Sequence, residues 1–274
     1  MRTKTIQSIF LAVFGVLSLA CSRTERMAAI DGFAQGTTYH IVIEGCEDMQ
    51  LLKTEMDSIL DDISASMSLF DQGSLINAIN SNKTDSLDKH IIECINAAHI
   101  ISEQSEGNYD ITIKPLVQVR GFLAGEASDS FNVDSLLEFV GYNKISIADG
   151  RLVKQSPSVE IDLSSIAQGY TADVLSEYLS SKGYLNYLVE IGGEIMCKGQ
   201  REQGRNWRVG IDKPIDDNIV PGAELQVILS IPSGKGLATS GNYRKYTYDN
   251  QGNKVVHTIS PITGQSVVYI QDVY

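Results

Sequence analysis

The sequence has little positive charge and only one long apolar run. Its 274 residues carry 22 Lys and Arg against 34 Asp and Glu, which gives a formal net charge of −12. No basic arm or basic repeat is present, so nucleic acid is excluded as the main partner, because phosphates are met by clustered cations. The apolar run lies at the N-terminus, which excludes an internal transmembrane helix.

Cysteine is also scarce. The four cysteines in 274 residues show no CxxC spacing, which excludes a disulfide scaffold and a zinc site of ordinary spacing. A chain of this length can bury a core without such staples. Cys46, Cys94 and Cys197 are therefore predicted to be small buried residues. With 43% hydrophobic and 20% charged residues, the chain has the composition of a globular protein.

The N-terminus has the pattern of a targeting segment. Arg2 and Lys4 precede an apolar stretch over residues 9–20, which ends next to Cys21. This pattern resembles a bacterial lipobox, with Ser18 where an aliphatic residue is usual. It predicts a lipoprotein signal peptide over 1–20, lipidation of Cys21, a short tether over 21–29 and a folded domain over 30–274. The folded domain is then extracytoplasmic, lipid-anchored to a bacterial membrane on the periplasmic side. The alternatives are an ordinary signal peptide or a short anchor.

Hydrophobic periodicity predicts helices and hairpins in mixed order. A 3.6-residue period indicates amphipathic helices over 52–63, over 87–101 and around Val174 to Leu179. Asp149-Gly150 indicates a hairpin between strands 145–147 and 152–154. Residues 110–122 are predicted to be irregular, and a short helix is expected over 136–140. The mixed order favours an α+β fold. The further strands expected are 38–43, 187–191, 207–211, 225–231, 244–248 and 254–256.

Five short segments combine glycines, hydroxyls and ionisable groups. Glycines and hydroxyls beside strand ends expose backbone N–H groups that suit phosphate oxygens. Ordinary interpretations stay open: Gly192-Gly193 as a tight turn, Asp162 as a helix cap, and His257 as a core histidine. None of the segments is a P-loop or a GxGxxG motif. The segments are 35–38, 108–112 leading to Pro115-Leu116, 162–170 with Asp173, 190–194, and 238–243 followed by 257–264.

Taken together and in this order, the segments resemble the FAD:protein FMN transferase (ApbE-like) family. The resemblance extends over about residues 30–270, essentially the whole expected domain. The matching residues are Gly36-Thr37; Ser68-Leu69-Phe70 with Ser74 and Asn80; Tyr109-Asp110-Ile111-Thr112 with Pro115-Leu116; 162–170 with Asp173; Gly192-Gly193-Glu194; Thr239-Ser240-Gly241 with Tyr243; and 257–264.

The resemblance implies a fold and an activity. The fold would be α+β, an ApbE-like (T-fold-related) single domain of mixed, mainly antiparallel sheet with packed helices. The activity would be Mg²⁺-dependent transfer of FMN from FAD to a Thr or Ser hydroxyl of a target flavoprotein, with release of AMP. The acceptor would be a flavoprotein of a respiratory or extracytoplasmic redox system.

The resemblance also assigns roles to residues. His257 would be the base that accepts the hydroxyl proton. Ser165 would offer its backbone carbonyl to Mg²⁺. Gln35, Phe70 and Gln168 stand where the family has Met, Tyr and Lys. The residues expected to bind FAD are Gln35, Phe70, Asn108, Tyr109, Asp110, Asp162, Gln168, Thr258 and Ile259.

The C-terminal end departs from the family pattern. The family continues into an Ala-Asp-x-x-x-Thr segment that completes its metal site, whereas this sequence stops at Tyr274, in an expected strand that begins near Val267. The domain is therefore expected to be C-terminally incomplete, either as a fragment of a longer reading frame or as a naturally short member. Two other functions stay open: an FAD pyrophosphatase that yields FMN and AMP, and a membrane-tethered FAD-binding protein without turnover.

Overall fold

The centre of the fold is a five-stranded, fully antiparallel sheet. The computed structural model describes residues 27–123, 131–201, 204–215, 218, 220, 222–243, 246–248 and 251–267. The sheet order is β1-β2-β5-β6-β9. β1 begins inside the range expected to be a tether, and the expected signal peptide and Cys21 lie outside the described residues. The strands are β1 Met27–Ala34, β2 Thr37–Glu44, β5 Tyr187–Ile191, β6 Glu194–Lys198 and β9 Lys235–Leu237.

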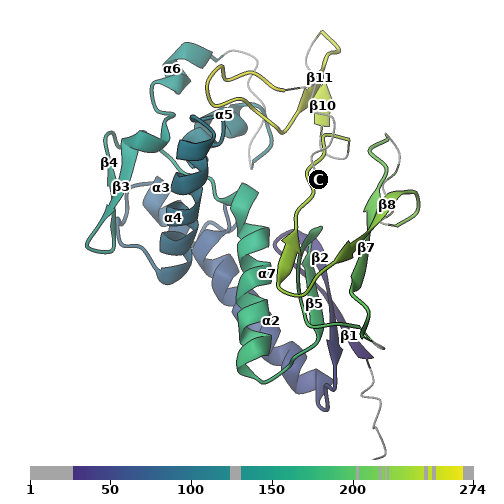
Figure 1. Cartoon of the computed structure of the whole chain (residues 1–274). Coiled ribbons are helices and arrows are strands. Elements are labelled where there is room, and N and C mark those ends of the chain that lie inside the picture. Colours follow the sequence, from purple (N-terminus) through teal and green to yellow (C-terminus); the bar gives the residue numbers. More distant parts are fainter. Residues whose placement is uncertain are drawn as a thin grey trace, which may run out of the picture.

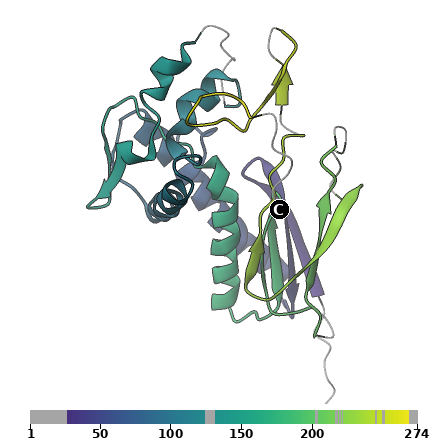
Figure 2. The ribbon, with the colours of Figure 1, turned by 45° about the horizontal axis from the view of Figure 1, so that its top comes forward.

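Two long helices cover one face of this sheet. They are α2 (Met49–Met67) and α7 (Ser164–Ser181), and Figure 1 shows them side by side against β2 and β5. Apolar residues of β2 and β5 alternate toward the helices, so Ile41, Ile43 and Val189 pack with Leu175 and Leu179 in one buried cluster. The packing fixes α7 between the sheet and the rest of the helices, as Figure 2 also shows.

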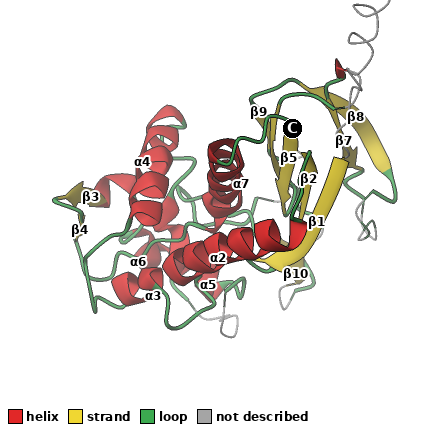
Figure 3. Ribbon diagram, turned by 90° about the horizontal axis from the view of Figure 1, so that it is seen from below, coloured by secondary structure: helices red, strands yellow, loops and turns green. Residues whose placement is uncertain are grey.

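The opposite face of the sheet is covered by a hairpin. It consists of β7 (Trp207–Asp212) and β8 (Leu225–Ile231), labelled at the upper right of Figure 3. Trp207 and Ile231 pack there on Leu188, Ile195 and Cys197 of the sheet. Cys94 and Cys197 are buried as predicted, whereas Cys46 is partly exposed.

The remaining helices form a second layer beside α7, with their own core. The expectation of irregular structure over 110–122 is wrong, because η1 begins at Ile111 and α5 follows it directly. Asp110 caps η1, and Pro115 occupies the first turn of α5, where a missing N–H costs nothing. The elements of this layer are α3 Leu75–Asn80, α4 Lys89–Gln104, η1 Ile111–Ile113, α5 Lys114–Val119, α6 Val133–Leu137, η2 Tyr142–Lys144, β3 Ile145–Ala148 and β4 Arg151–Lys154.

The last described segment returns to the helical layer. After the hairpin of β10 (Tyr246–Tyr248) and β11 (Lys254–Val256), the chain passes close to α5 and α6 (Figures 1 and 2). Val267 lies outside any strand, and Ser266 forms only an isolated bridge with Ile259. In the described ranges, no helix combines the length and apolar character needed to cross a membrane. The α+β class predicted from the sequence is confirmed.

Candidate functional site

The first turn of α7 is the centre of the candidate site, and Asp162 holds it in place. The Asp162 carboxylate accepts a 2.8 Å hydrogen bond from the N–H of Ser164, and its own N–H donates to the Ile111 carbonyl at 2.7 Å. The side chain is only 7% exposed. Asp162 lies one residue before Leu163, the N-cap residue of α7, which has no side-chain cap hydrogen bond; through its bonds to Ser164 and Ile111, Asp162 ties the entry of α7 to η1.

The loop that joins α4 to η1 brings Tyr109 to α7. The Tyr109 hydroxyl lies 3.0 Å from the Ser165 hydroxyl. Burial raises the pKa of the Tyr109 phenol above its ordinary value of 10.0, with the Ser165 bond opposing the rise. Tyr109 is therefore a neutral hydrogen-bonding group near neutral pH. Asn108, beside it, is exposed and donates to the Ser105 carbonyl at 2.9 Å.

Asp110 has a local structural task. Its carboxylate accepts hydrogen bonds from the backbone N–H of Thr112 at 2.8 Å and from the Thr112 hydroxyl at 2.6 Å. The Thr112 oxygen in turn accepts from the Gly141 N–H at 2.7 Å. Asp110 is buried and fixes the entry into η1. Both hydrogen bonds go to the same carboxylate oxygen, Oδ1, so a ligand would have to contact the other oxygen, Oδ2.

The turn between β1 and β2 reaches α7 from the sheet. Ala34 pairs with Thr37, so Gln35 and Gly36 form a two-residue hairpin loop, with φ angles of 52° and 74°. Both values are typical of a type I′ turn. The turn lets Gln35 extend over the helix, where its amide nitrogen donates to the Thr171 hydroxyl at 2.6 Å.

The turn between β5 and β6 lies against the same part of α7. A Cβ atom at Gly192, where φ is +61°, would lie 2.7 Å from the Gln168 amide nitrogen and 2.8 Å from Thr37 Cγ2. A side chain at this position would have to displace the ends of Gln168 and Thr37, at a φ angle that favours glycine. The N–H of Gly193 donates to the Glu190 carboxylate at 2.6 Å. Burial raises the pKa of Glu190, and this N–H and nearby His40 oppose the rise.

The C-terminal segment is fastened by its own hydrogen bonds. Thr258 donates to the Asn242 side-chain oxygen at 2.7 Å, and the N–H of Val267 donates to the Thr258 carbonyl at 2.8 Å. Ile259 is 6% exposed and packs with Leu116. The side chain of Ile259 thus belongs to a small core, and only its backbone can contact a ligand freely.

His257 lies on the C-terminal segment after β11, and Phe70 lies in the turn after α2. His257 is partly buried, and its ring meets Phe122 edge-on with centroids 6.3 Å apart. Phe70 is 67% exposed. An exposed aromatic ring can stack on a planar ligand.

Two residues that the sequence did not single out hold these parts together. Thr171 anchors Gln35, as described above. Arg120, at the end of α5, donates to the Gly264 carbonyl at 2.5 Å and so fixes the loop that follows His257. Burial lowers the pKa of Arg120 below its ordinary value. Neither residue has a local sequence signal, because its partner lies more than a hundred residues away.

Two open cavities lie elsewhere, on the helical layer. One has a volume of about 390 Å³ and the other about 670 Å³, and they share Asn82 and Pro157. None of the residues expected to bind FAD or Mg²⁺ lines either cavity. We place the candidate site at α7, because five of those residues meet there through close contacts. They are Gln35, Tyr109, Asp162, Ser165 and Gln168.

Comparison with protein families gives one match over most of the chain. The model of the ApbE family matches residues 35–273. The FAD:protein FMN transferase of Vibrio cholerae is 32% identical over 268 residues, which cover 94% of this chain and 78% of the relative. The protein of the same name from Haemophilus influenzae is 30% identical over 281 residues, covering 96% and 80%.

Solved structures agree with the fold. The flavin transferase ApbE from Vibrio cholerae superposes with a TM-score of 0.75 at 30% identity, covering 89% of this chain and 79% of that chain. The ApbE protein from Thermotoga maritima gives a TM-score of 0.77 at 24% identity, covering 90% and 80%, which bears on the fold alone. The expected ApbE-like architecture is confirmed.

Proposed function

The chain belongs to the ApbE family, and from this premise we propose that it is an FAD:protein FMN transferase. The observation that carries the proposal is the meeting of expected FAD-binding residues around the first two turns of α7. Gln35 comes from the β1–β2 turn, Tyr109 from the loop after α4, and Gln168 from α7 itself. These three segments are far apart in the sequence and lie together at the first two turns of α7, which is how a binding site for a large nucleotide is assembled.

The start of α7 suits the diphosphate of FAD. A helix N-terminus carries partial positive charge, which favours phosphate oxygens. At α7 the N–H of Ser164 is already bonded to Asp162, so the helix contributes mainly through this partial charge. Tyr109 and Ser165 add hydroxyl groups at this end, 3.0 Å apart. Gln168 adds an amide on the next turn, without the charge of a lysine. The site would therefore bind the diphosphate mainly through neutral donors.

The reaction would be a phosphoryl transfer. The acceptor hydroxyl oxygen forms a new bond to the phosphorus of the FMN half, and the bond to the bridging oxygen breaks, so that AMP leaves with that oxygen. The hydroxyl proton passes to a base, for which His257 is our candidate. In such reactions a protein acts mainly by positioning the two groups and stabilising charge.

The Mg²⁺ requirement is a separate part of the proposal. When bound, Mg²⁺ neutralises charge on phosphate oxygens. Over the described ranges, no three His, Cys, Asp or Glu side chains are grouped to hold a metal ion. These residues do not supply a metal site by themselves, and the Ser165 carbonyl would act only together with oxygens of the diphosphate.

The test is AMP release from FAD, measured with Mg²⁺ and with an acceptor domain from a respiratory flavoprotein. The proposal expects AMP together with FMN bound covalently to a Thr or Ser of the acceptor, and expects EDTA to stop both. AMP without any need for acceptor would instead identify an FAD pyrophosphatase. FAD binding that is independent of Mg²⁺ and yields no AMP would identify a flavin-binding protein without turnover.

We also propose that the protein acts outside the cytoplasm, anchored to the membrane through lipid on Cys21. The support is the lipobox-like sequence alone. Its test is metabolic labelling with a radioactive fatty acid: the wild type should be labelled and Cys21→Ala should not. Equal labelling of both proteins would refute lipidation at Cys21.

A further inference from the structure

His257 is followed by a loop over residues 258–267, and hydrogen bonds join the two ends of this loop. The N–H of Val267 donates to the Thr258 carbonyl at 2.8 Å. Asn242 also connects both ends, because it accepts from the Thr258 hydroxyl at 2.7 Å and donates to the Val267 carbonyl at 3.2 Å. The loop is therefore a closed unit, and a contact at its turn bears on the position of His257 at its start.

Arg120 holds the turn of the 258–267 loop. Arg120 directly follows α5, and its Nη2 donates to the Gly264 carbonyl at 2.5 Å and to Gln265 Oε1 at 3.5 Å. Its guanidinium lies over the Phe131 ring, 5.5 Å from the ring centroid. Among the described residues, both hydrogen bonds of this side chain thus go to the 258–267 loop.

Apolar packing brings the same loop close to α5 and α6. Ile259 is buried with Leu116 of α5. A Cβ atom at Gly264, where φ is +65°, would collide with Val133 of α6. The turn of the loop therefore lies directly against the helical layer, and this close approach brings the Gly264 carbonyl within reach of Arg120.

The stability of the fold does not account for a cation at this place. Among the described residues, no carboxylate forms an ion pair with Arg120. Its Nε is buried without a hydrogen-bond partner in that part of the chain. A partly buried cation without a counter-ion costs free energy that an apolar side chain would avoid. We therefore look for the role of Arg120 in the segment that it holds.

α5 connects Arg120 to the candidate FAD site. The N–H of Asp162 donates to the Ile111 carbonyl at 2.7 Å, which joins the entry of α7 to η1, and α5 directly follows η1. Two residues after Arg120, Phe122 meets the His257 ring edge-on with centroids 6.3 Å apart. The end of α5 therefore contacts both His257 and the loop that follows it.

We propose that Arg120 is a positioning residue for flavin transfer, which holds the 258–267 loop on α5 and so sets the place of His257 relative to the start of α7. This inference rests on the proposed function, in which His257 accepts the proton of the acceptor hydroxyl. A base must lie within hydrogen-bond reach of that proton, and a displacement of about 1 Å can lower the rate about 100-fold. Arg120 acts on the reaction only through His257.

The experiment is a double-mutant cycle on AMP release from FAD, with Mg²⁺ and the acceptor domain. Arg120→Met should lower kcat about tenfold or more and change the KM for FAD less than about twofold. Arg120→Lys should recover part of the loss, because an ammonium can still donate to the Gly264 carbonyl. In the His257→Ala background, Arg120→Met should lower the remaining rate no further.

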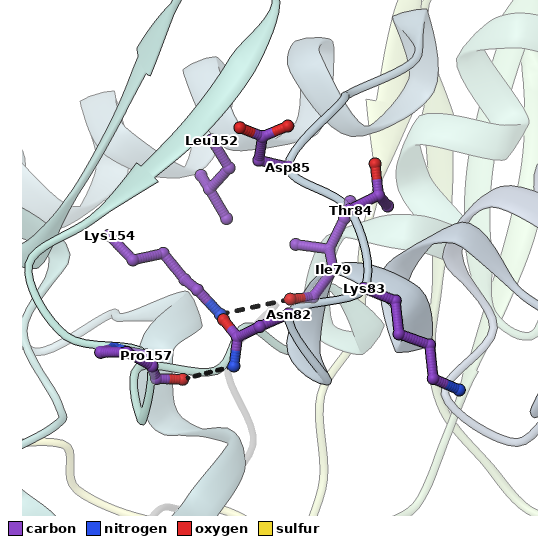
Figure 4. A pocket seen from close by; sticks show the side chains of 8 residues that line it. All are labelled: Ile79, Asn82, Lys83, Thr84, Asp85, Leu152, Lys154 and Pro157. Carbon is purple, nitrogen blue, oxygen red and sulfur yellow. Dashed lines mark hydrogen bonds between the residues drawn. The ribbon is translucent and has the colours of Figure 1, made fainter.

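Arg151→Met is the matched control. Arg151 lies on β4, is exposed and pairs with Asp85, which lines the cavity shown in Figure 4. This variant loses the same charge as Arg120→Met at a place away from the 258–267 loop, so its kcat should equal that of the wild type. Thermal unfolding of each variant shows whether it folds like the wild type.

Hydrogen exchange tests the anchoring of the loop without turnover. The N–H of Gly264 donates to the Ser260 carbonyl at 2.8 Å inside the loop, and the N–H of Val267 closes it. Both should exchange faster in Arg120→Met, and neither should change in Arg151→Met.

Two outcomes would overturn the proposal. The first is a loss of rate in Arg120→Met that is equally large with and without His257, because the effect would then not pass through His257. The second is unchanged exchange of the two loop amides in Arg120→Met, because the loop would then hold its place without Arg120. A wild type that releases no AMP would instead refute the proposed function, and faster exchange would still support the anchoring of the loop by Arg120.

Discussion

The amide nitrogen of Gln35 donates a 2.6 Å hydrogen bond to the hydroxyl of Thr171, across 136 residues of sequence. The Thr171 hydroxyl gives its own proton to the Ala167 carbonyl at 2.7 Å. Its oxygen can therefore only accept from Gln35, and this fixes which way the Gln35 amide points. The bond holds the β1–β2 turn against the second turn of α7. It therefore connects the sheet to the part of α7 that forms the candidate site.

Replacing His257 with Ala tests the proposed base. We expect AMP release to fall about 100-fold or more, because a positioned base contributes on that order to proton transfer. FAD affinity should change little. His99→Ala is the control, since His99 lies on α4 and pairs with Glu103 at 3.4 Å. Normal turnover in His257→Ala would remove this residue from the mechanism.

Asp162→Ala should weaken both the protein and FAD binding. Loss of the bond to the Ser164 N–H should lower the free energy of unfolding by about 1 kcal/mol. Asp88→Ala is a matched control, because Asp88 caps α4 by accepting from the Ile91 N–H at 2.9 Å. Urea unfolding should give a similar loss for both variants, but only Asp162→Ala should weaken FAD binding. Equal FAD affinity in the two variants would limit Asp162 to its structural role at the entry of α7.

Gln168→Lys should tighten FAD binding. A lysine near the diphosphate adds charge attraction that the amide lacks, and we expect a gain on the order of fivefold in affinity at low salt. Gln104→Lys, at the exposed end of α4, carries the same change of net charge away from the candidate site. Fluorescence titration with FAD should separate the two variants, and a gain of the same size in both would indicate a general charge effect.

Gly192→Ala should damage the protein more than Gly150→Ala. Both glycines have positive φ, at 61° and 72°, so each substitution carries a backbone strain of roughly 1 kcal/mol. A Cβ at Gly150 has open space, whereas one at Gly192 would collide with Gln168 and Thr37. Thermal unfolding should therefore show a clearly larger loss for Gly192→Ala, together with weaker FAD binding. Losses of equal size would mean that the contact with Gln168 adjusts without cost.

Glu190→Gln should stabilise the protein near neutral pH. Burial raises the folded-state pKa of Glu190 above its ordinary value of 4.5. The folded chain then holds the proton to a higher pH than the unfolded chain, so this group lowers the free energy of unfolding as pH rises above about 4.5. The amide oxygen of Gln can still accept from the Gly193 N–H.

The gain from Glu190→Gln should therefore be present near pH 7 and vanish near pH 3, where Glu190 is protonated in both states. Urea unfolding at the two pH values measures it. Glu106→Gln, at an exposed turn after α4, is the control variant. A stabilisation of equal size at both pH values would argue against a buried charge as its cause.

Local sequence patterns predict the long helices and one hairpin. They do not predict some of the strands, which form only through tertiary contacts. The helices α2, α4 and α7 and the hairpin of β3 and β4 follow from periodicity and a turn dipeptide. β1, β6 and β9 were not foreseen, because short or partly polar strands acquire their identity from the neighbours with which they pair. Pro115 favoured irregular chain, yet it lies in the first turn of α5, which directly follows η1 and where proline is tolerated.

The sequence by itself determined the composition, the α+β class, the order of the motifs and the family to which they belong. These follow from local patterns and from residue identities that need no neighbours in space. Only the tertiary structure decided that Gln35 meets Thr171, that Tyr109 meets Ser165, and that the side chain of Ile259 is buried in a core. Such contacts join residues far apart in the chain, and they depend on how the sheet packs against α7, which no local pattern encodes.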